Sequence, residues 1–457
     1  MSTRQYFKTQ YSFDFEQAIW DREPELLIMD QVLDQNPQII MLAAPCFPKA
    51  HGETKVKVGR DGMSLEQVVR AAIYQRHKRL TYRQLSDHTE DSKKGRSFMK
   101  MEHQKLFSHQ ALQDNISKIN SETLEEIHIA MVQYAIKLGV DKGHKLRTDS
   151  TTIKTNIHYP TNAALLWDCI RVSYRFLKQA KALLADFNFR SYHKSGKKLL
   201  FKIVNTKGKE KRCPLFKKML QANRRCERLV EQAKEQLSAY SFQDALKEKE
   251  RRELLQQFTD LLPKMQQVTD IAHRREILDE QVPVEDKIFS IFEDHTDCIK
   301  KGGREVIFGH KINFSSGKSN LIFDCIQQRG NPADTSYLPK TLDNIEINFK
   351  ITPRDVAFDG GYASKKNRDD AKARGIINVV FNKVKGSMKN SASSKKMETM
   401  LKKWRSGMEA IISNFKRGLN ASMSPWKGWE AFKCYVLWGL ITFNMRVIAK
   451  WIIDQLS

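Results

Sequence analysis

From residue 62 onward, the apolar positions recur with the spacing of amphipathic helices. Ser64 followed by Gln67 is a capping-box pattern. The apolar residues behind it fall on one helical face: Leu65, Val68, Val69, Ala72 and Ile73. Thr81 with Gln84 repeats the start signal. The pattern predicts a small helical domain over residues 62–140; a helix-turn-helix is one interpretation of its first two helices, and an ordinary helical pair is the other.

Apolar and polar residues then alternate at 145–152 (KLRTDSTT), which predicts a strand that carries Asp149 near its end. A charged helical pattern occupies 163–282, with a loop expected around His193 to Gly208. Further strands are predicted at KIFSIF (287–292), VIFGHKINF (306–314), NLIFDCIQQ (320–328), VAFDGGY (356–362) and INVVF (377–381). Helices are predicted between the later strands and after the last one. The order predicts an α/β fold, with a mixed sheet flanked by helices.

Positive charge is concentrated in two segments. The whole chain carries 78 Lys and Arg against 53 Asp and Glu, a net charge of +25. Residues 171–230 contribute about +15 and residues 383–417 about +8, counted from the sequence. Local fields of this kind favour a polyanion, of which nucleic acid is the commonest inside a cell. The alternative is that these residues form solvated helix faces.

The seven cysteines include no C-x-x-C pair, so a structural zinc site and a disulfide framework are not expected. A reducing compartment is the simpler interpretation. The amino end has no apolar region of the secretory type. The most apolar stretch, 435–453, contains Asn444, Arg446 and Lys450, which favours a buried helix over a membrane span.

Three carboxylates are candidates for chemistry. Asp149 and Asp359 are expected at strand ends, and Asp359 precedes two glycines that let the chain turn sharply. Glu409 is expected on the helix after the last strand. At 100° per residue, Arg405, Glu409 and Lys416 lie along one face of that helix. Each carboxylate also has a plain structural interpretation, as a turn residue, a helix cap or a partner in an ion pair.

The order of these motifs resembles a known family. RTDST, FGHKI and FDGGYAS, followed by a helix with R-x-x-x-E and E-x-x-x-x-x-x-K spacing, look like the DDE transposases of bacterial insertion sequences. The segment Thr155 to Asp168 is similar to the group labelled ISNCY. Lys402 stands where the family signature has a tyrosine.

The resemblance implies an RNase H-like core interrupted by a large helical insertion. The expected divisions are an N-terminal segment, a helical and DNA-binding domain, the catalytic core, a basic helical insertion and a C-terminal apolar helix. Their residues are 1–61, 62–140, 141–162 with 283–421, 163–282 and 422–457, respectively.

The resemblance also implies the chemistry. Asp149, Asp359 and Glu409 would hold two Mg²⁺ or Mn²⁺ ions, and three carboxylates without His or Cys suit such hard cations. The expected DNA contacts are Arg405, Lys416, Lys311 and His310. The alternative for Arg405 and Lys416 is a salt bridge within the protein, and the alternative for Lys311 and His310 is a structural role at the sheet edge.

The implied activity is DNA cleavage and strand transfer. The partners would be terminal inverted repeats and target DNA, the chain would be a homodimer, and no membrane would be involved. The expected location is the bacterial cytoplasm, with the nucleoid. Two alternatives are an RNase H-like nuclease without strand transfer and an inactive, transposase-derived DNA-binding protein.

Overall fold

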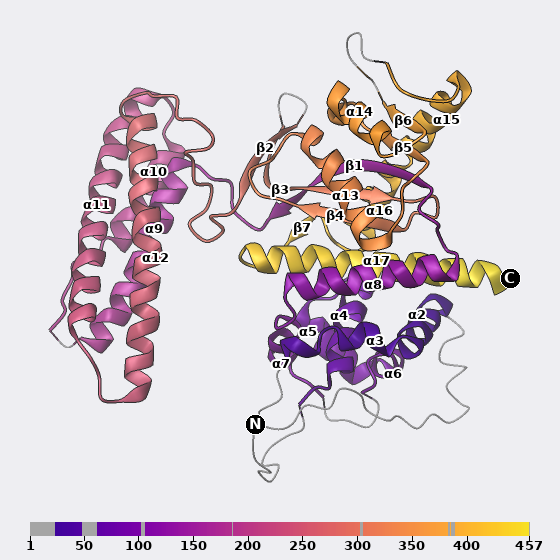
Figure 1. Cartoon of the computed structure of the whole chain (residues 1–457). Coiled ribbons are helices and arrows are strands. Elements are labelled where there is room, and N and C mark those ends of the chain that lie inside the picture. The colour runs from indigo at the N-terminus through magenta and orange to yellow at the C-terminus, as the bar shows by residue number, and fades with distance from the viewer. Residues whose placement is uncertain are drawn as a thin grey trace. The chain divides into compact units, whose positions relative to one another are not determined.

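The structure is a computed structural model that describes residues 23–47, 62–101, 106–184, 186–301, 305–382, 384 and 389–456. The chain divides into two compact units. The first contains Met1–Thr155 and Gly309–Ser457, and the second contains Asn156–Phe308. Figure 1 shows both units.

A mixed sheet forms the centre of the first unit (Figure 1). The strand order is β2-β3-β1-β5-β6, with β4 paired to β3 and β7 paired to β1. β1 runs antiparallel to β3 and parallel to β5, which is parallel to β6. The strands are β1 Lys145–Thr155, β2 Asp297–Lys301, β3 Glu305–Ser316, β4 Ile322–Gln327, β5 Asp355–Phe358, β6 Asn378–Phe381 and β7 Met423–Ser424. β2 and the first residues of β3 fall within the second unit. The predicted fold class is confirmed: a mixed α/β sheet flanked by helices, consistent with an RNase H-like core.

Helices cover both faces of this sheet. Successive strand residues point to opposite faces, and two neighbours on β3 identify the coverings. The Phe314 ring lies 4.9 Å from that of Phe415 on α16. The next side chain back, Asn313, donates a hydrogen bond of 3.0 Å to Thr341 on α13. The helices are α13 Tyr337–Phe349, α14 Lys365–Ala373, α15 Lys395–Ser406 and α16 Met408–Gly418.

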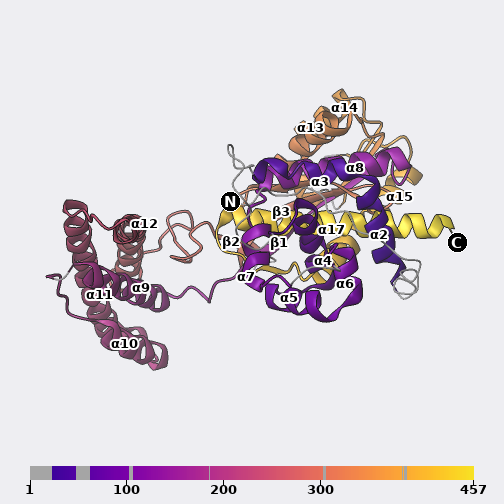
Figure 2. The same cartoon turned by 90° about the horizontal axis from the view of Figure 1, so that it is seen from below.

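The last helix, α17 Trp429–Leu456, runs between the sheet and the N-terminal helices (Figures 1 and 2). It packs against α8, α2 and α4 on one side and against β4 and β7 on the other. The Asn444 amide accepts from the backbone N–H of Ile322 at 2.9 Å and donates to its carbonyl at 2.8 Å. Among the described helices, α17 is long and apolar enough to cross a membrane, but 67% of its most apolar stretch is buried inside the structure.

The N-terminal helices begin where the capping patterns predict. Both predicted capping boxes are present, at Ser64 for α4 and at Thr81 for α5. Two further helices, α2 and α3, lie in the segment 1–61, where no element was predicted. The helices are α2 Pro24–Gln35, α3 Pro37–Met41, α4 Leu65–Lys78, α5 Tyr82–Asp91, α6 Lys93–Phe98, α7 His109–Ile116 and α8 Ser121–Leu138.

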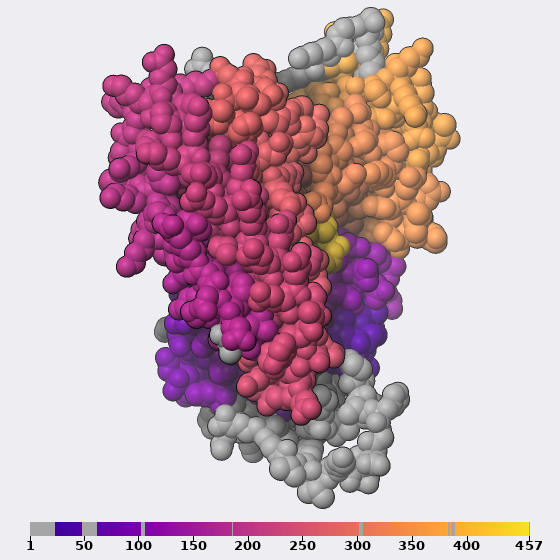
Figure 3. All heavy atoms as spheres, turned by 90° about the vertical axis from the view of Figure 1, so that its left-hand side faces the viewer, coloured from indigo at the N-terminus to yellow at the C-terminus, as the bar shows by residue number. Residues whose placement is uncertain are grey.

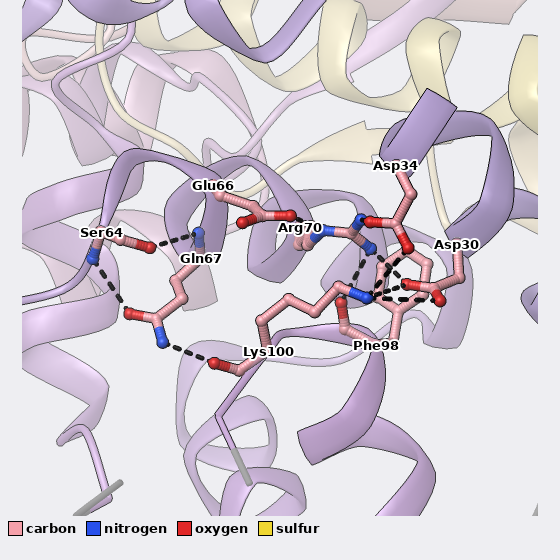
Figure 4. Close-up of polar contacts among 8 residues, drawn as sticks. All are labelled: Asp30, Asp34, Ser64, Glu66, Gln67, Arg70, Phe98 and Lys100. Atoms are coloured by element: carbon pink, nitrogen blue, oxygen red, sulfur yellow. Dashed lines mark hydrogen bonds and ion pairs between the residues drawn. The ribbon is translucent and has the colours of Figure 1, made fainter. Parts of the chain in front are cut away.

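A buried ion-pair network joins α2 to α4 (Figure 4). The Arg70 side chain is fully buried, and its guanidinium donates to Asp30 at 2.5 Å, to Asp34 at 2.5 Å and to Glu66 at 2.9 Å. Lys100 also contacts both aspartates. Breaking a buried network of this kind leaves uncompensated charge, so Arg70 is a structural residue of this unit.

The second unit is helical. Its helices are α9 Asn162–Leu183, α10 His193–Asn205, α11 Lys209–Ala239 and α12 Ala245–Glu276. The three long helices, α9, α11 and α12, pack against one another around apolar side chains such as Leu166, Val230 and Phe258. Figure 3 shows the outer atoms of this unit, coloured magenta to salmon. The helical region predicted at 163–282 lies within it.

Two local predictions in this unit are wrong. The loop expected around His193 to Gly208 is mostly the helix α10, whose apolar side chains Ile203 and Leu200 pack into the helical core. The strand expected at 287–292 does not form, because Ile288 and Ile291 are buried in the same helical core instead of pairing with a sheet. The strand β2 was not predicted.

Candidate active site

Two aspartates leave adjacent parallel strands at the same point. β1 pairs with β5 from Lys145 opposite Asp355 to Thr148 opposite Phe358. Asp149 follows Thr148, and Asp359 follows Phe358, so the two carboxylates occupy matching positions on neighbouring strands. Because side chains alternate between faces, both point to the same side of the sheet.

The position of Asp149 within its strand differs from the prediction. Asp149 lies in the middle of β1, which continues to Thr155, and pairs with Phe314 of β3. The strand continues because β3 is long enough to pair with it beyond the end of β5. Asp149 is therefore at the end of the parallel pairing, although it is not at the end of its strand.

The helix α15 covers this face of the sheet. Leu401 is fully buried against Ala357 of β5 and Val380 of β6. Arg405 lies four residues after Leu401 and so projects from the same face of α15, one turn further along. This packing brings the Arg405 guanidinium to the ends of β1 and β5.

Arg405 bridges the two aspartates. Its Nη2 lies 2.5 Å from Asp149 Oδ2, and its Nη1 lies 3.2 Å from Asp359 Oδ1. The side chain of Arg405 is 6% exposed, that of Asp149 16% and that of Asp359 41%. The structure thus brings together three of the residues singled out in the sequence, from positions up to 256 residues apart, as two carboxylates around one buried cation.

Burial raises the pKa of Asp149 from 3.8 to about 6. The neighbouring carboxylates Asp359 and Asp334 raise it further, while Arg405 and the backbone N–H of Ser150 oppose the shift. The surroundings of Asp149 therefore disfavour its ionised form, and a further cation bound beside it would stabilise that form.

A second buried arginine fixes the end of α15. Arg147 of β1 donates to the carbonyl of Trp404 at 2.7 Å and to Asn320 Oδ1 at 2.5 Å, and its guanidinium lies 4.9 Å from the centroid of the Trp404 ring. A Cβ at Gly407 would lie 2.3 Å from Arg147 Nη1. Only glycine at 407 allows this approach, and sequence reasoning did not find either residue.

The expected continuous helix face through Arg405, Glu409 and Lys416 is interrupted. α15 ends at Ser406, α16 begins at Met408, and Gly407 lies between them. The reason is the contact that Arg147 makes with the Trp404 carbonyl, which is one of the last acceptors of α15.

Glu409 lies in the first turn of α16 and is exposed. Among the described residues, no group of three or more His, Cys, Asp or Glu side chains lies close enough to hold a metal ion. Asp149 and Asp359 supply hard oxygen ligands around a cation, and this donor set fits Mg²⁺ or Mn²⁺. Two of the three predicted metal ligands are thus brought together, and Glu409 is not joined to them in this conformation.

The other predicted DNA contacts differ in exposure. Lys311 Nζ donates to the carbonyl of Pro332 at 2.8 Å and lies 3.2 Å from Asp334 Oδ1, and its side chain is 15% exposed. Lys416 is partly exposed in the last turn of α16. His310 is fully buried against the rings of Trp429 and Phe432. His310 has no exposed surface in this conformation, which fits the structural alternative, and its DNA contact stays a prediction.

Asp334 is a further polar residue near the site. It lies in η3 Asp334–Ser336, accepts from the Ser150 hydroxyl at 3.2 Å and pairs with Lys311. A Cβ at Gly361 would lie 2.7 Å from Asp334 Oδ2. The chain turns tightly after Asp359, in η4 Gly360–Tyr362, and the absence of a Cβ at Gly361 permits the close approach of Asp334 to that turn. No pattern in the sequence points to Asp334, because its contacts are set by the packing of η3 against the loop after β5.

Comparison with known families bears on this geometry. Residues 300–445 match the family model described as "Transposase DDE domain". The chain carries a transposase DDE domain. The match includes Asp359, Arg405 and Glu409 and begins after Asp149. It does not identify the ISNCY group, which stays a prediction. No curated protein and no solved structure matches the chain.

Proposed function

We propose that this transposase binds the ends of an insertion sequence, cuts the DNA and joins it to a target. The observation that carries the proposal is the convergence of Asp149 and Asp359 on one cation, within a chain that holds a transposase DDE domain. Phosphodiester cleavage needs an activated nucleophile and a stabilised leaving oxygen, and paired divalent ions supply both.

In the proposed site, Asp149 and Asp359 would hold two Mg²⁺ or Mn²⁺ ions, which would activate the nucleophile and stabilise the leaving oxygen. Glu409 supplies the third carboxylate from the start of α16. DDE transposases typically use divalent metals. The raised pKa of Asp149 means that its ionised form is disfavoured without an added cation, which supports metal binding here. Between reactions Arg405 neutralises part of the negative charge of Asp149 and Asp359, and during a reaction it contacts a phosphate oxygen.

The DNA path in this proposal is basic. Lys416 and Lys311 contact phosphates near the reacting strand. The second unit also binds DNA, through α10 and α11, where lysines and arginines are frequent and mostly exposed. The protein acts as a homodimer, since two element ends must be paired, and it acts on the nucleoid in the bacterial cytoplasm.

A strand-transfer assay tests the proposal. The substrate is labelled DNA from the flanks of the coding sequence, with a supercoiled target and Mg²⁺. Joined product supports the transposase. Cleavage without joining would replace it with a nuclease, and binding without cleavage would replace it with an inactive DNA-binding protein.

A further inference from the structure

A cavity of about 610 Å³ opens in the first unit, apart from the carboxylate site. Its wall combines the turn between α4 and α5, one side of α7 and the chain around Trp426. Among the described residues that line it, three are cationic, Arg76, Arg79 and Lys427, and none is acidic. The cavity therefore favours an anionic ligand.

Arg76 is the buried cation of this cavity. The residue is 5% exposed, and its Nε and Nη2 atoms have no hydrogen-bond partner. Its guanidinium lies 3.8 Å from the centroid of the Tyr435 ring, which is a favourable cation–π contact. This contact leaves the buried N–H groups unsatisfied, and a buried unsatisfied donor costs free energy. Nε and Nη2 are themselves enclosed, and Nη2 lies beside Gly439 of α17, so an anion in the cavity would be attracted by the positive charge of the guanidinium and would not bond to these two atoms.

The part of the wall next to Arg76 is aromatic. The rings of Tyr82 and Trp426 are stacked, with centroids 6.1 Å apart and planes 15° from parallel. Trp426 also meets the ring of Tyr435 edge-on, at 5.6 Å. The Tyr435 hydroxyl donates to the carbonyl of Asn420 at 2.7 Å, which fixes that ring. A flat ring system would find stacking partners here.

We propose that this cavity binds one nucleotide, with its phosphate on Arg76, Arg79 and Lys427 and its base against Trp426. The volume is within the range of small-molecule pockets, and base stacking with phosphate pairing is the usual way in which proteins hold unpaired nucleotides. An inorganic anion would leave the aromatic wall unused. A neutral aromatic ligand would leave the positive charge of Arg76, Arg79 and Lys427 uncompensated.

The nucleotide has two sources, an unpaired position of a DNA strand or a free mononucleotide. We take the DNA strand as the source, and this part of the inference rests on the proposed function. The α4–α5 pair, which resembles a helix-turn-helix in sequence, then contributes its turn to the capture of an unpaired nucleotide.

Fluorescence of 2-aminopurine tests the inference, because stacking on an indole quenches it. The probes are a single-stranded oligonucleotide with one 2-aminopurine, the 2-aminopurine mononucleotide and inorganic phosphate as a competitor. The full chain is compared with Arg79→Ala/Lys427→Ala and with Trp426→Ala. The matched control is Lys137→Ala/Lys450→Ala, which removes the same charge from exposed positions outside the cavity.

We expect quenching of the strand by the parent and the control. Arg79→Ala/Lys427→Ala loses two phosphate contacts, so its binding of the strand should weaken about tenfold or more. Trp426→Ala should bind with little quenching, and circular dichroism checks its fold. If Trp426→Ala does not fold, Arg79→Ala/Lys427→Ala alone tests the site.

Other results would overturn the inference. Equal weakening by the control would show a general charge effect, and unchanged quenching in Trp426→Ala would remove the base from this wall. Quenching of the mononucleotide without the strand would reject DNA as the source. A gel shift with duplex DNA separates the two proposals: duplex binding without quenching contradicts the cavity alone, and loss of all DNA binding contradicts the proposed function.

Discussion

The raised pKa of Asp149 makes the stability of the first unit depend on pH in a specific direction. In the folded chain this pKa is about 6, against 3.8 for an aspartate that is free in water, as it is in the unfolded chain. The folded state therefore holds the Asp149 proton more tightly. Stability from this group is fully present below about pH 4 and is lost as the pH rises through about 6.

The magnitude follows from the size of the shift. A shift from 3.8 to about 6 corresponds to about 3 kcal/mol, at 1.36 kcal/mol per pH unit. Asp149→Asn removes the ionisation and keeps a similar shape. Part of this change falls below pH 4, so the difference in unfolding free energy between the variant and the parent should move by about 2.4 kcal/mol in favour of the variant between pH 4 and pH 7.5.

Urea unfolding at several pH values measures this difference. Tryptophan fluorescence follows unfolding, and buried Trp438 on α17 contributes the signal of the first unit together with the other tryptophans. EDTA keeps divalent ions from binding the carboxylates. Asp454→Asn is the matched control, because Asp454 is exposed near the end of α17. A difference between Asp149→Asn and the parent that stays constant with pH would refute the reasoning, as would the same trend in the control.

Three further predictions concern residues that hold the site or the first unit in place. Gly407→Ala places a Cβ 2.3 Å from Arg147 Nη1, so urea unfolding should show a loss of about 1–3 kcal/mol, and DNA cleavage should fall. Arg405→Gln removes the cation between two aspartates, so the rise in melting temperature on adding Mg²⁺ should be larger than in the parent. Arg70→Met leaves three carboxylates without their buried partner, so urea unfolding should show a loss of about 3–5 kcal/mol.

Each of these variants has a control or a contrary result. Gly418→Ala is matched to Gly407→Ala, because the nearest atom to its added Cβ lies at 3.5 Å, and it should be near neutral. Arg83→Met is matched to Arg70→Met, because Arg83 is exposed on α5. For Arg405→Gln, an Mg²⁺ effect no larger than in the parent would argue against competition between the arginine and the metal.

Local sequence signals predicted much of the fold. The capping boxes at Ser64 and Thr81 fix two helix starts through neighbouring residues alone, and both are observed. The strand patterns around Asp149 and Asp359 also gave the correct elements. Their proximity follows from parallel pairing of those strands, which the motif order suggested and the register establishes.

Features that depend on distant partners were missed. The break at Gly407 is fixed by Arg147, 260 residues earlier in the chain, so no local pattern reveals it. The segment that contains Ile288 and Ile291 has the composition of a strand, yet both side chains are buried in the helical core and the segment forms no hydrogen-bonded pairing with another strand. The burial of His310 depends in the same way on Trp429 and Phe432 of α17.

The central claim is that Asp149, Asp359 and Glu409 together hold divalent ions. Electron paramagnetic resonance of Mn²⁺ tests it directly, by counting ions bound to the full chain with element-end DNA. The account predicts two ions for the parent and a loss of tight binding in Asp149→Asn, Asp359→Asn and Glu409→Gln, each with DNA binding retained. Undiminished Mn²⁺ binding in Asp149→Asn would contradict it.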